Sequence, residues 1–202
     1  TAGTSYTYDA HHYTIPAIGA HQATNAGFAI EAARALHLPD HAIQQGLAAT
    51  VRPGCMERVA TNPTIYIDGA HNQEKMRSTI AAIQAVVPPT SPVHIVLAIS
   101  SDKDARALIQ DLAQCATTIT TTQYQPAGGK QPFAATALAE IAKEFLPAEQ
   151  VQAVEDAQVA FAAVLARIPK DATLVVTGSL YLAGAIRSRY VSEDDILLHG
   201  HT

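Results

Sequence analysis

The pattern of apolar and polar positions changes near residue 64 of the chain. Before that point, aromatic and β-branched residues at 6–8 and 13–16 predict two short strands joined by a polar turn at 9–12. Apolar residues then recur every three or four positions through 23–36. This spacing predicts a helix with one apolar face.

From residue 64 onward, predicted strands alternate with predicted helices. The strands are expected at 64–68, 93–99, 117–122, 151–154 and 174–177. The helices are expected at 76–87, 105–112, 133–145, 159–168 and 180–190. Such βαβ units connect in a right-handed sense and build a parallel sheet with helices on both faces. The predicted class is therefore α/β, a Rossmann-like doubly wound and mostly parallel sheet.

The first fifty residues do not share this rhythm and are expected to be the edge of a different domain. Asp40 is predicted to cap a second short helix there. We place one unit at 1–52 and the α/β domain at 53–202, and we expect the chain to be a piece of something larger. The apolar helix face at 23–36 would then have packed on an absent domain. In this chain we expect that face to be buried by the chain itself or by a second copy in a dimer.

Composition and charge argue against nucleic acid and membrane as partners. The 202 residues carry a formal net charge of −5, and their Lys and Arg residues are spread singly, which gives no basic footprint for nucleic acid. No window approaches the ~18 continuous apolar residues of a membrane span. Two distant cysteines, Cys55 and Cys115, and the lack of an apolar cationic leader favour the cytoplasm over a secreted disulfide scaffold.

Candidate chemistry gathers directly after three predicted strands, where parallel sheets form their ligand crevice. These places are residues 68–72 (Asp-Gly-Ala-His-Asn), 100–104 (Ser-Ser-Asp-Lys-Asp) and 178–179 (Gly-Ser). We expect all three to face one crevice. Each also has a simpler structural interpretation, because Asp, Asn and Ser are common helix caps or first-turn residues, and a lone histidine is usually an ordinary surface residue.

Other site motifs are missing or weak. The sequence contains no phosphate-binding loop, no G-x-G-x-x-G after a strand, no nucleophile elbow at residues 178–179 and no H-E-x-x-H pair. His11 and His12 fall in the predicted turn, and His199 and His201 in the tail, where solvated roles are expected. We predict no metal ligands within this chain.

Five short motifs occur in an order that resembles the folylpolyglutamate synthases, the folate branch of the Mur ligase superfamily. They are residues 19–26, 52–58, 67–72, 102–104 and 176–182. The resemblance covers nearly the whole chain. It implies a Mur ligase C-terminal domain preceded by a remnant of the central ATPase domain.

The resemblance also implies a reaction and a set of site residues. The family is an ATP-dependent amide ligase, in which a folate carboxylate is phosphorylated and the amine of L-glutamate attacks the acyl phosphate. By similarity, Asn25 would contact adenine and Asp68 the ribose, while His71 would contact the nucleotide or the incoming glutamate and Ser179 would lie near the glutamate site. His71 and Ser179 are thus the candidate catalytic residues. ATP and Mg would be needed, with the phosphate and metal sites mostly in an N-terminal ATPase domain.

One departure bears on this expectation. The family has Trp-Pro-Gly-Arg where this chain has Arg52-Pro53-Gly54-Cys55, and a thiol cannot replace a guanidinium that grips phosphate. Either Arg52 or Arg58 compensates, or nucleotide handling is impaired. We expect the chain alone to be inactive. The alternatives are a non-catalytic α/β binding or interaction module derived from a Mur-type ligase, and a separate Rossmann protein, which the missing glycine fingerprint disfavours.

Overall fold

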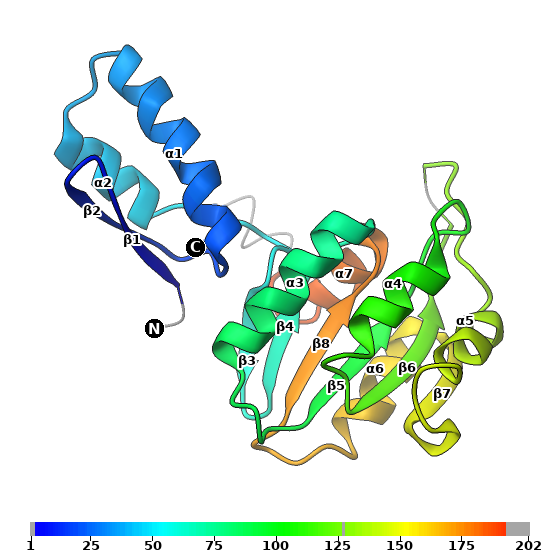
Figure 1. The fold of residues 1–202 in the computed structure, drawn as a ribbon. Coiled ribbons are helices and arrows are strands. Elements are labelled where there is room, and N and C mark those ends of the chain that lie inside the picture. Colours follow the sequence, from blue (N-terminus) through cyan, green and yellow to red (C-terminus); the bar gives the residue numbers. More distant parts are fainter. Residues whose placement is uncertain (1–2, 127, 193–202) are drawn as a thin grey trace.

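The computed structural model describes residues 3–126 and 128–192, and it has two parts (Figure 1). The smaller part comprises β1 (Thr4–Tyr8), β2 (His11–Ile15), α1 (Ala20–Ala35) and α2 (Asp40–Ala48). The larger part holds the remaining strands and helices around one sheet. The domain boundary near residue 52 stays a prediction. The tail histidines lie outside the described residues.

The strands β1 and β2 form an antiparallel hairpin with Tyr6 opposite Tyr13. Its turn is only two residues long, Asp9 and Ala10, both with positive φ, as expected for a turn that matches the twist of the flanking strands. The predicted turn at 9–12 was therefore too long. His11 and His12 belong to β2, because the tight turn lets pairing begin at once.

The helix α1 packs on this hairpin with part of its predicted apolar face. Ile30 is fully buried and joins Tyr13 in the core of the small part, but Leu36 remains 75% exposed. The predicted cap at Asp40 is wrong. Pro39 is the N-cap residue of α2, and the Asp40 carboxylate pairs instead with Arg34, at 3.4 Å.

The larger part contains a six-stranded sheet in the order β3-β4-β8-β5-β6-β7. Its strands are β3 (Glu57–Thr61), β4 (Thr64–Ile67), β5 (Val93–Leu97), β6 (Thr118–Gln123), β7 (Val151–Asp156) and β8 (Thr173–Thr177). All neighbours run parallel except β3, which is antiparallel to β4 at the sheet edge. This confirms the predicted α/β class with a mostly parallel sheet, while β3 itself was not predicted.

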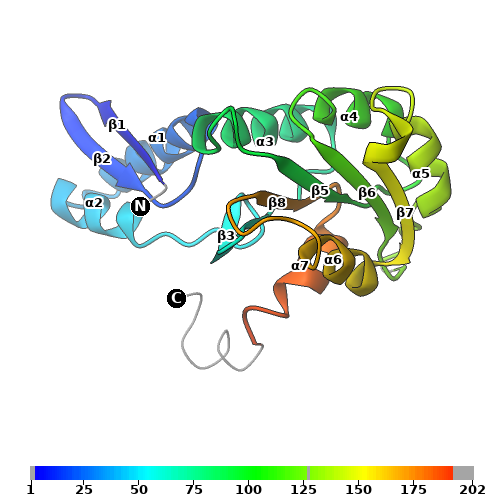
Figure 2. The same ribbon diagram turned by 90° about the horizontal axis from the view of Figure 1, so that it is seen from below.

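Helices cover both faces of the sheet (Figure 2). One face carries α3 (Gln73–Val86), α4 (Ala105–Leu112) and α5 (Ala135–Ala142), and the other carries α6 (Ala157–Leu165) and α7 (Leu180–Arg187). A 3-10 turn, η1 (Ala148–Gln150), precedes β7. The chain moves outward from β4 and β5 to β7 and returns through α6, so that β8 enters between β4 and β5.

The predicted core positions are largely confirmed. Every residue of β8 is buried, and the apolar faces of α3 and α4 are buried against the sheet. Among the described residues, no helix has the length and apolar character needed to cross a membrane.

Candidate functional site

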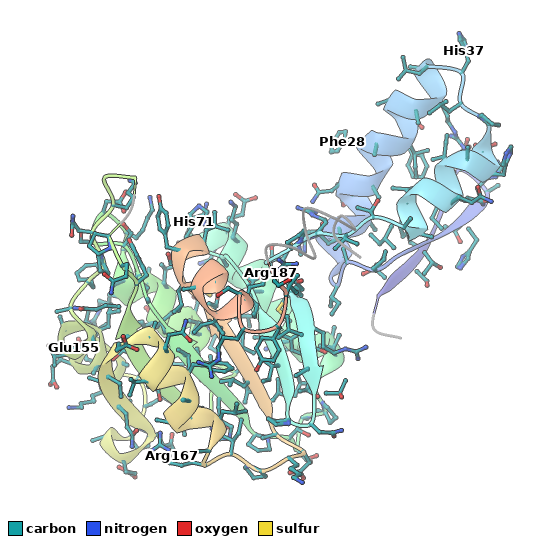
Figure 3. All side chains as sticks on the ribbon, turned by 180° about the vertical axis from the view of Figure 1, so that it is seen from behind. Phe28, His37, His71, Glu155, Arg167 and Arg187 are labelled. Carbon is teal, nitrogen blue, oxygen red and sulfur yellow. The ribbon has the colours of Figure 1, made fainter. Side chains whose placement is uncertain are left out.

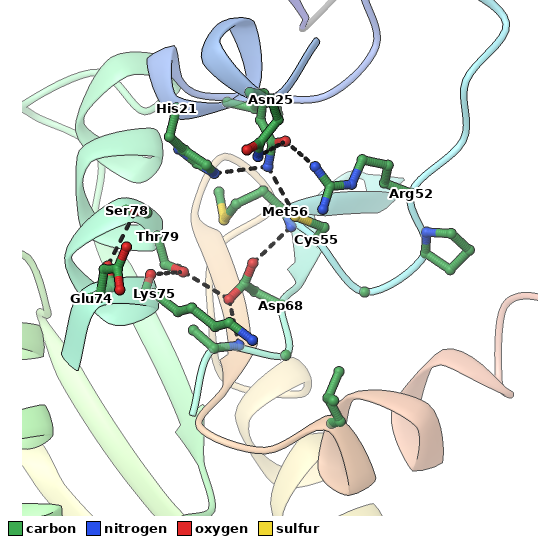
Figure 4. Close-up of a pocket in the computed structure, with 17 residues that line it drawn as sticks. His21, Asn25, Arg52, Cys55, Met56, Asp68, Glu74, Lys75, Ser78 and Thr79 are labelled. Atoms are coloured by element: carbon green, nitrogen blue, oxygen red, sulfur yellow. Dashed lines mark hydrogen bonds between the residues drawn. The ribbon is translucent and has the colours of Figure 1, made fainter. Parts of the chain in front are cut away.

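A pocket of about 400 Å³ lies where α1 meets the carboxyl end of β4 (Figure 4). Its walls come from the start of α1, the loop at 52–56, the loop after β4, the first turns of α3 and the start of α7. The polar and charged residues that line it are His21, Gln22, Asn25, Arg52, Cys55, Asp68, Glu74, Lys75, Ser78 and Thr79. Both parts of the chain therefore contribute to one cavity.

Asp68 fixes the floor of this pocket. Its side chain follows β4 and is 5% exposed. One carboxylate oxygen accepts from the backbone N–H of Met56 at 2.9 Å, and the other accepts from the Ala70 N–H at 2.9 Å and the Thr79 hydroxyl at 2.7 Å. A carboxylate has about four acceptor positions. Asp68 thus ties three segments together and keeps one acceptor position for another donor.

Gln22 is the hub of the opposite wall. It is 2% exposed, and its amide nitrogen donates to Cys55 Sγ at 3.2 Å and bonds His21 Nε2 at 2.8 Å. Its amide oxygen accepts from Asn25 Nδ2 at 3.3 Å and from Arg52 Nη1. A glutamine side chain has two donors and two acceptor positions. Every hydrogen-bonding position of Gln22 is therefore used.

This arrangement fixes the state of His21. Because the Gln22 nitrogen is a donor, His21 Nε2 must accept, and the neutral ring then carries its proton on Nδ1. Burial and the nearby Arg52 charge both lower the pKa of His21, which favours the neutral ring. The ring also packs closely on Gly19, where an added Cβ would lie 2.8 Å from it at a φ of 112°. The Gly-Ala-His-Gln motif at 19–22 thus builds one wall of the pocket.

The charges of the pocket come from both parts of the chain. Burial raises the pKa of the Cys55 thiol, so this position stays neutral. Arg52 and Lys75 are the lining cations, whereas Arg58 lies on β3 outside this pocket. Of the two arginines that the sequence offered as compensation for Cys55, the structure brings only Arg52 to the site.

The four predicted site residues divide into two pairs. Asn25 and Asp68 line the pocket together, but His71 and Ser179 do not. His71 is half-buried on the loop after β4, where its Nδ1 bonds the Gly69 carbonyl at 2.8 Å (Figure 3).

Ser179 and His71 nevertheless belong to neighbouring loops. Ser179 is buried at the N-terminus of α7 and accepts from the Tyr181 N–H at 3.1 Å. A Cβ at Gly69 would lie only 2.2 Å from the Leu180 side chain, so the His71 loop packs on the start of α7. The simpler interpretation as a helix cap is confirmed for Ser179, and equally for Asn72, which caps α3.

The loop after β5 does not reach this pocket. Asp102 pairs there with Lys103 at 3.1 Å and with Lys130 at 2.5 Å. Lys130, Ser100 and Lys103 together hold the pKa of the Asp102 carboxyl well below its usual range. Asp104 is the N-cap of α4. Of the three predicted loops, only the one after β4 lines this pocket, because neither residues 100–104 nor residues 178–179 belong to its lining. The strands β4, β8 and β5 are neighbours, and a single crevice shared by all three loops stays a prediction.

Comparison with known proteins assigns the class. Residues 54–180 match the family described as "Mur ligase, glutamate ligase domain", so the chain belongs to this family. This excludes an unrelated Rossmann protein.

The relatives that the chain matches are named folylpolyglutamate synthases, and the match falls on their C-terminal part. The chain is 32% identical over 179 residues to folylpolyglutamate synthase of Lacticaseibacillus casei, a match that covers 86% of this chain and 39% of that protein. It is 27% identical to dihydrofolate synthase/folylpolyglutamate synthase of Bacillus subtilis, covering 85% of this chain and 40% of that protein. Mycobacterium tuberculosis folylpolyglutamate synthase complexed with ADP superimposes with a TM-score of 0.81 at 25% identity, covering 90% of this chain and 43% of that chain. The chain thus spans about two fifths of the length of these relatives.

Proposed function

We propose that this chain is the C-terminal part of an ATP-dependent ligase that adds L-glutamate to the γ-carboxyl group of a folate. The observation that carries the proposal is the shared pocket, which is lined both by Asn25 from α1 and by Asp68 from the end of β4. The M. tuberculosis relative is complexed with ADP, which supports a nucleotide as the ligand of this pocket.

The adenosine end of the nucleotide fits the chemistry of this pocket. The Asn25 side chain is exposed and gives one N–H to Gln22, so its other N–H and its carbonyl oxygen are available to an adenine edge. The free acceptor position of Asp68 suits a ribose hydroxyl. Asp68 thereby has two tasks, to hold the loop and to orient the sugar.

His71 and Ser179 are proposed to serve the incoming glutamate. The Ser179 hydroxyl accepts from a backbone amide, which leaves its hydrogen to donate to a carboxylate. The first turn of α7 adds free N–H groups that favour an anion. His71, whose Nε2 has no bond to a described residue, lies on the loop that packs against this turn. These residues would orient the amine for attack on the activated folate.

The activation step calls for a metal site as well as cations at the phosphates. A carboxylate is a poor electrophile until phosphorylation supplies a leaving group, and phosphoryl transfer relies on cations and dipoles at the phosphates. Within the described residues, no group of three His, Cys, Asp or Glu could hold a metal ion. We therefore propose that a further ATPase domain supplies the Mg site and most of the phosphate site, and that it also covers the exposed face of α1.

The test compares the chain alone with the same chain joined to an N-terminal ATPase domain of a folylpolyglutamate synthase. Folate- and glutamate-dependent release of ADP is expected only from the joined protein. Turnover by the chain alone would refute the need for a further domain. A joined protein that binds nucleotide and never ligates would instead support the non-catalytic module, which the neutral Cys55 favours.

A further inference from the structure

We propose that Arg52 is the phosphate-binding cation of this pocket and that Gln22 is the residue that positions it. This assignment rests on the proposed nucleotide site, in which Arg52 would contact the phosphates of the nucleotide. Arg52 would then supply the positive charge that Cys55, in place of the family arginine, does not provide.

The guanidinium of Arg52 is held at the pocket with most of its donors free. It comes from the loop between the two parts of the chain, and Figure 4 shows it pointing toward the start of α1. One N–H group donates to the oxygen of Gln22. Of the five N–H donors of an arginine, the other four have no hydrogen bond to the described residues. A planar fork of this kind matches the oxygens of a phosphate.

Gln22 determines where this fork points. Its amide cannot turn over without setting a donor against Arg52, which has no acceptor, so the bond observed there would be lost. The same oxygen accepts from Asn25, the proposed adenine contact. A single buried amide thus sets the spacing between the proposed adenine contact and the proposed phosphate contact.

The lining of the pocket holds two cations, Arg52 and Lys75, and two carboxylates, Asp68 and Glu74. Neither cation has an ion pair within the described residues, so both can meet an anionic ligand. The Asp68 carboxylate is buried and its charge is met by three donors. Burial raises the pKa of the Cys55 thiol, so Cys55 adds no negative charge beside Arg52.

The experiment measures binding of ADP and of adenosine to the full chain by calorimetry, so that the phosphate contribution is separated from the base and sugar. Arg52→Gln is expected to lower the affinity for ADP by about tenfold or more, as for the loss of a charge-assisted hydrogen bond. The affinity for adenosine should not change. Arg52→Lys should lie between, because it keeps the charge and loses the fork. Arg58→Gln is the matched control, since this arginine lies outside the pocket, and it should change neither affinity.

The positioning role of Gln22 has its own readout. Gln22→Met keeps the side-chain volume and removes the amide, so the affinity for ADP should fall. Arg52→Lys should then reduce the ADP affinity by a smaller factor in the Gln22→Met background than in the original chain. Additive effects of the two substitutions would refute the coupling. Thermal melting of each variant checks that the fold is intact.

The possible outcomes separate the two proposals. Suppose that the chain binds ADP, and that Arg52→Gln leaves both affinities unchanged or lowers the affinities for ADP and adenosine equally. The assignment of Arg52 is then overturned, and the proposed nucleotide pocket stands. If the unaltered chain binds neither ADP nor adenosine, the pocket proposed in this chain fails and the assignment fails with it.

Discussion

Replacing Asp68 by Asn should reveal how much this carboxylate contributes to stability, apart from any ligand. The substitution keeps the shape and removes the charge of a side chain that is 5% exposed. Three donors point at its oxygens, from Met56, Ala70 and Thr79. Whichever way the new amide turns, its NH₂ group faces a backbone N–H that also needs an acceptor.

The expected loss follows from these contacts. Hydrogen bonds to a charged group contribute about 1.5–3 kcal/mol, and a buried donor left unsatisfied costs about 1–3 kcal/mol. We therefore expect Asp68→Asn to lower the free energy of unfolding by about 2–4 kcal/mol. Urea denaturation followed by circular dichroism should show a lower midpoint with an unchanged slope.

The control is Asp102→Asn. Asp102 also accepts charged hydrogen bonds, from Lys103 and Lys130, but its side chain is 41% exposed. Solvent screens such exposed pairs, so they contribute little to stability and this variant should stay close to the original midpoint. If the two variants behave alike, or if Asp68→Asn shifts stability by less than about 0.5 kcal/mol, the role given to Asp68 in tying the loops is wrong.

Three further predictions concern single sites. Cys55→Arg should bring no gain in ADP affinity, because Cys55 Sγ accepts from the Gln22 amide and a guanidinium would oppose donor to donor; tighter binding in calorimetry would contradict this. Gly178→Ala should destabilise the fold by about 2 kcal/mol or more, since φ is +97° and the new Cβ would lie 2.4 Å from the Ala98 carbonyl; an unchanged urea midpoint would contradict the clash. Burial and Arg167 lower the pKa of His94 from 6.5, so the unfolded chain takes up this proton first and the free energy of unfolding should fall as pH drops below about 6.5. Replacing His94 by Gln should flatten that slope between pH 8 and 5.5, and an unchanged slope would assign it to other groups.

The sequence predicts the parallel sheet well because its strands are buried on both faces. The run from Val93 to Ile99 is nearly continuous in apolar residues, and those residues fill the core on either side of β5. The buried helix faces are equally predictable from the sequence, since Met76 and Ile83 recur at helical spacing and are buried. Local pattern and tertiary burial agree in this part of the chain.

The edge strand β3 escaped prediction for a physical reason. Its residues, Glu-Arg-Val-Ala-Thr, show no clear alternation. An ion pair between Glu57 and Arg187, at 2.8 Å, ties β3 to α7 and joins residues 130 positions apart. A contact of this range leaves no signal in the local sequence.

The site was predictable only in part. Asn25 and Asp68 were identified through motifs, and the structure places both in one pocket. Arg52 was named only as one of two arginines that could compensate for Cys55. Gln22 was not singled out, because its burial arises only when α1 meets the loop at 52–56. Two polar residues on separate segments gain their roles from tertiary contact, and the closest signal was the Gly-Ala-His-Gln motif at 19–22.

The insertion of β8 between β4 and β5 has a consequence for folding during synthesis. The inner edges of β4 and β5 are both completed by residues 173–177, which are translated more than seventy residues after β5. Until then the nascent domain holds β4 apart from β5 and leaves two strand edges open to pairing with other chains. Protein truncated before Thr173 should therefore aggregate, and a chaperone that shields strand edges would act on this domain until its last strand emerges from the ribosome.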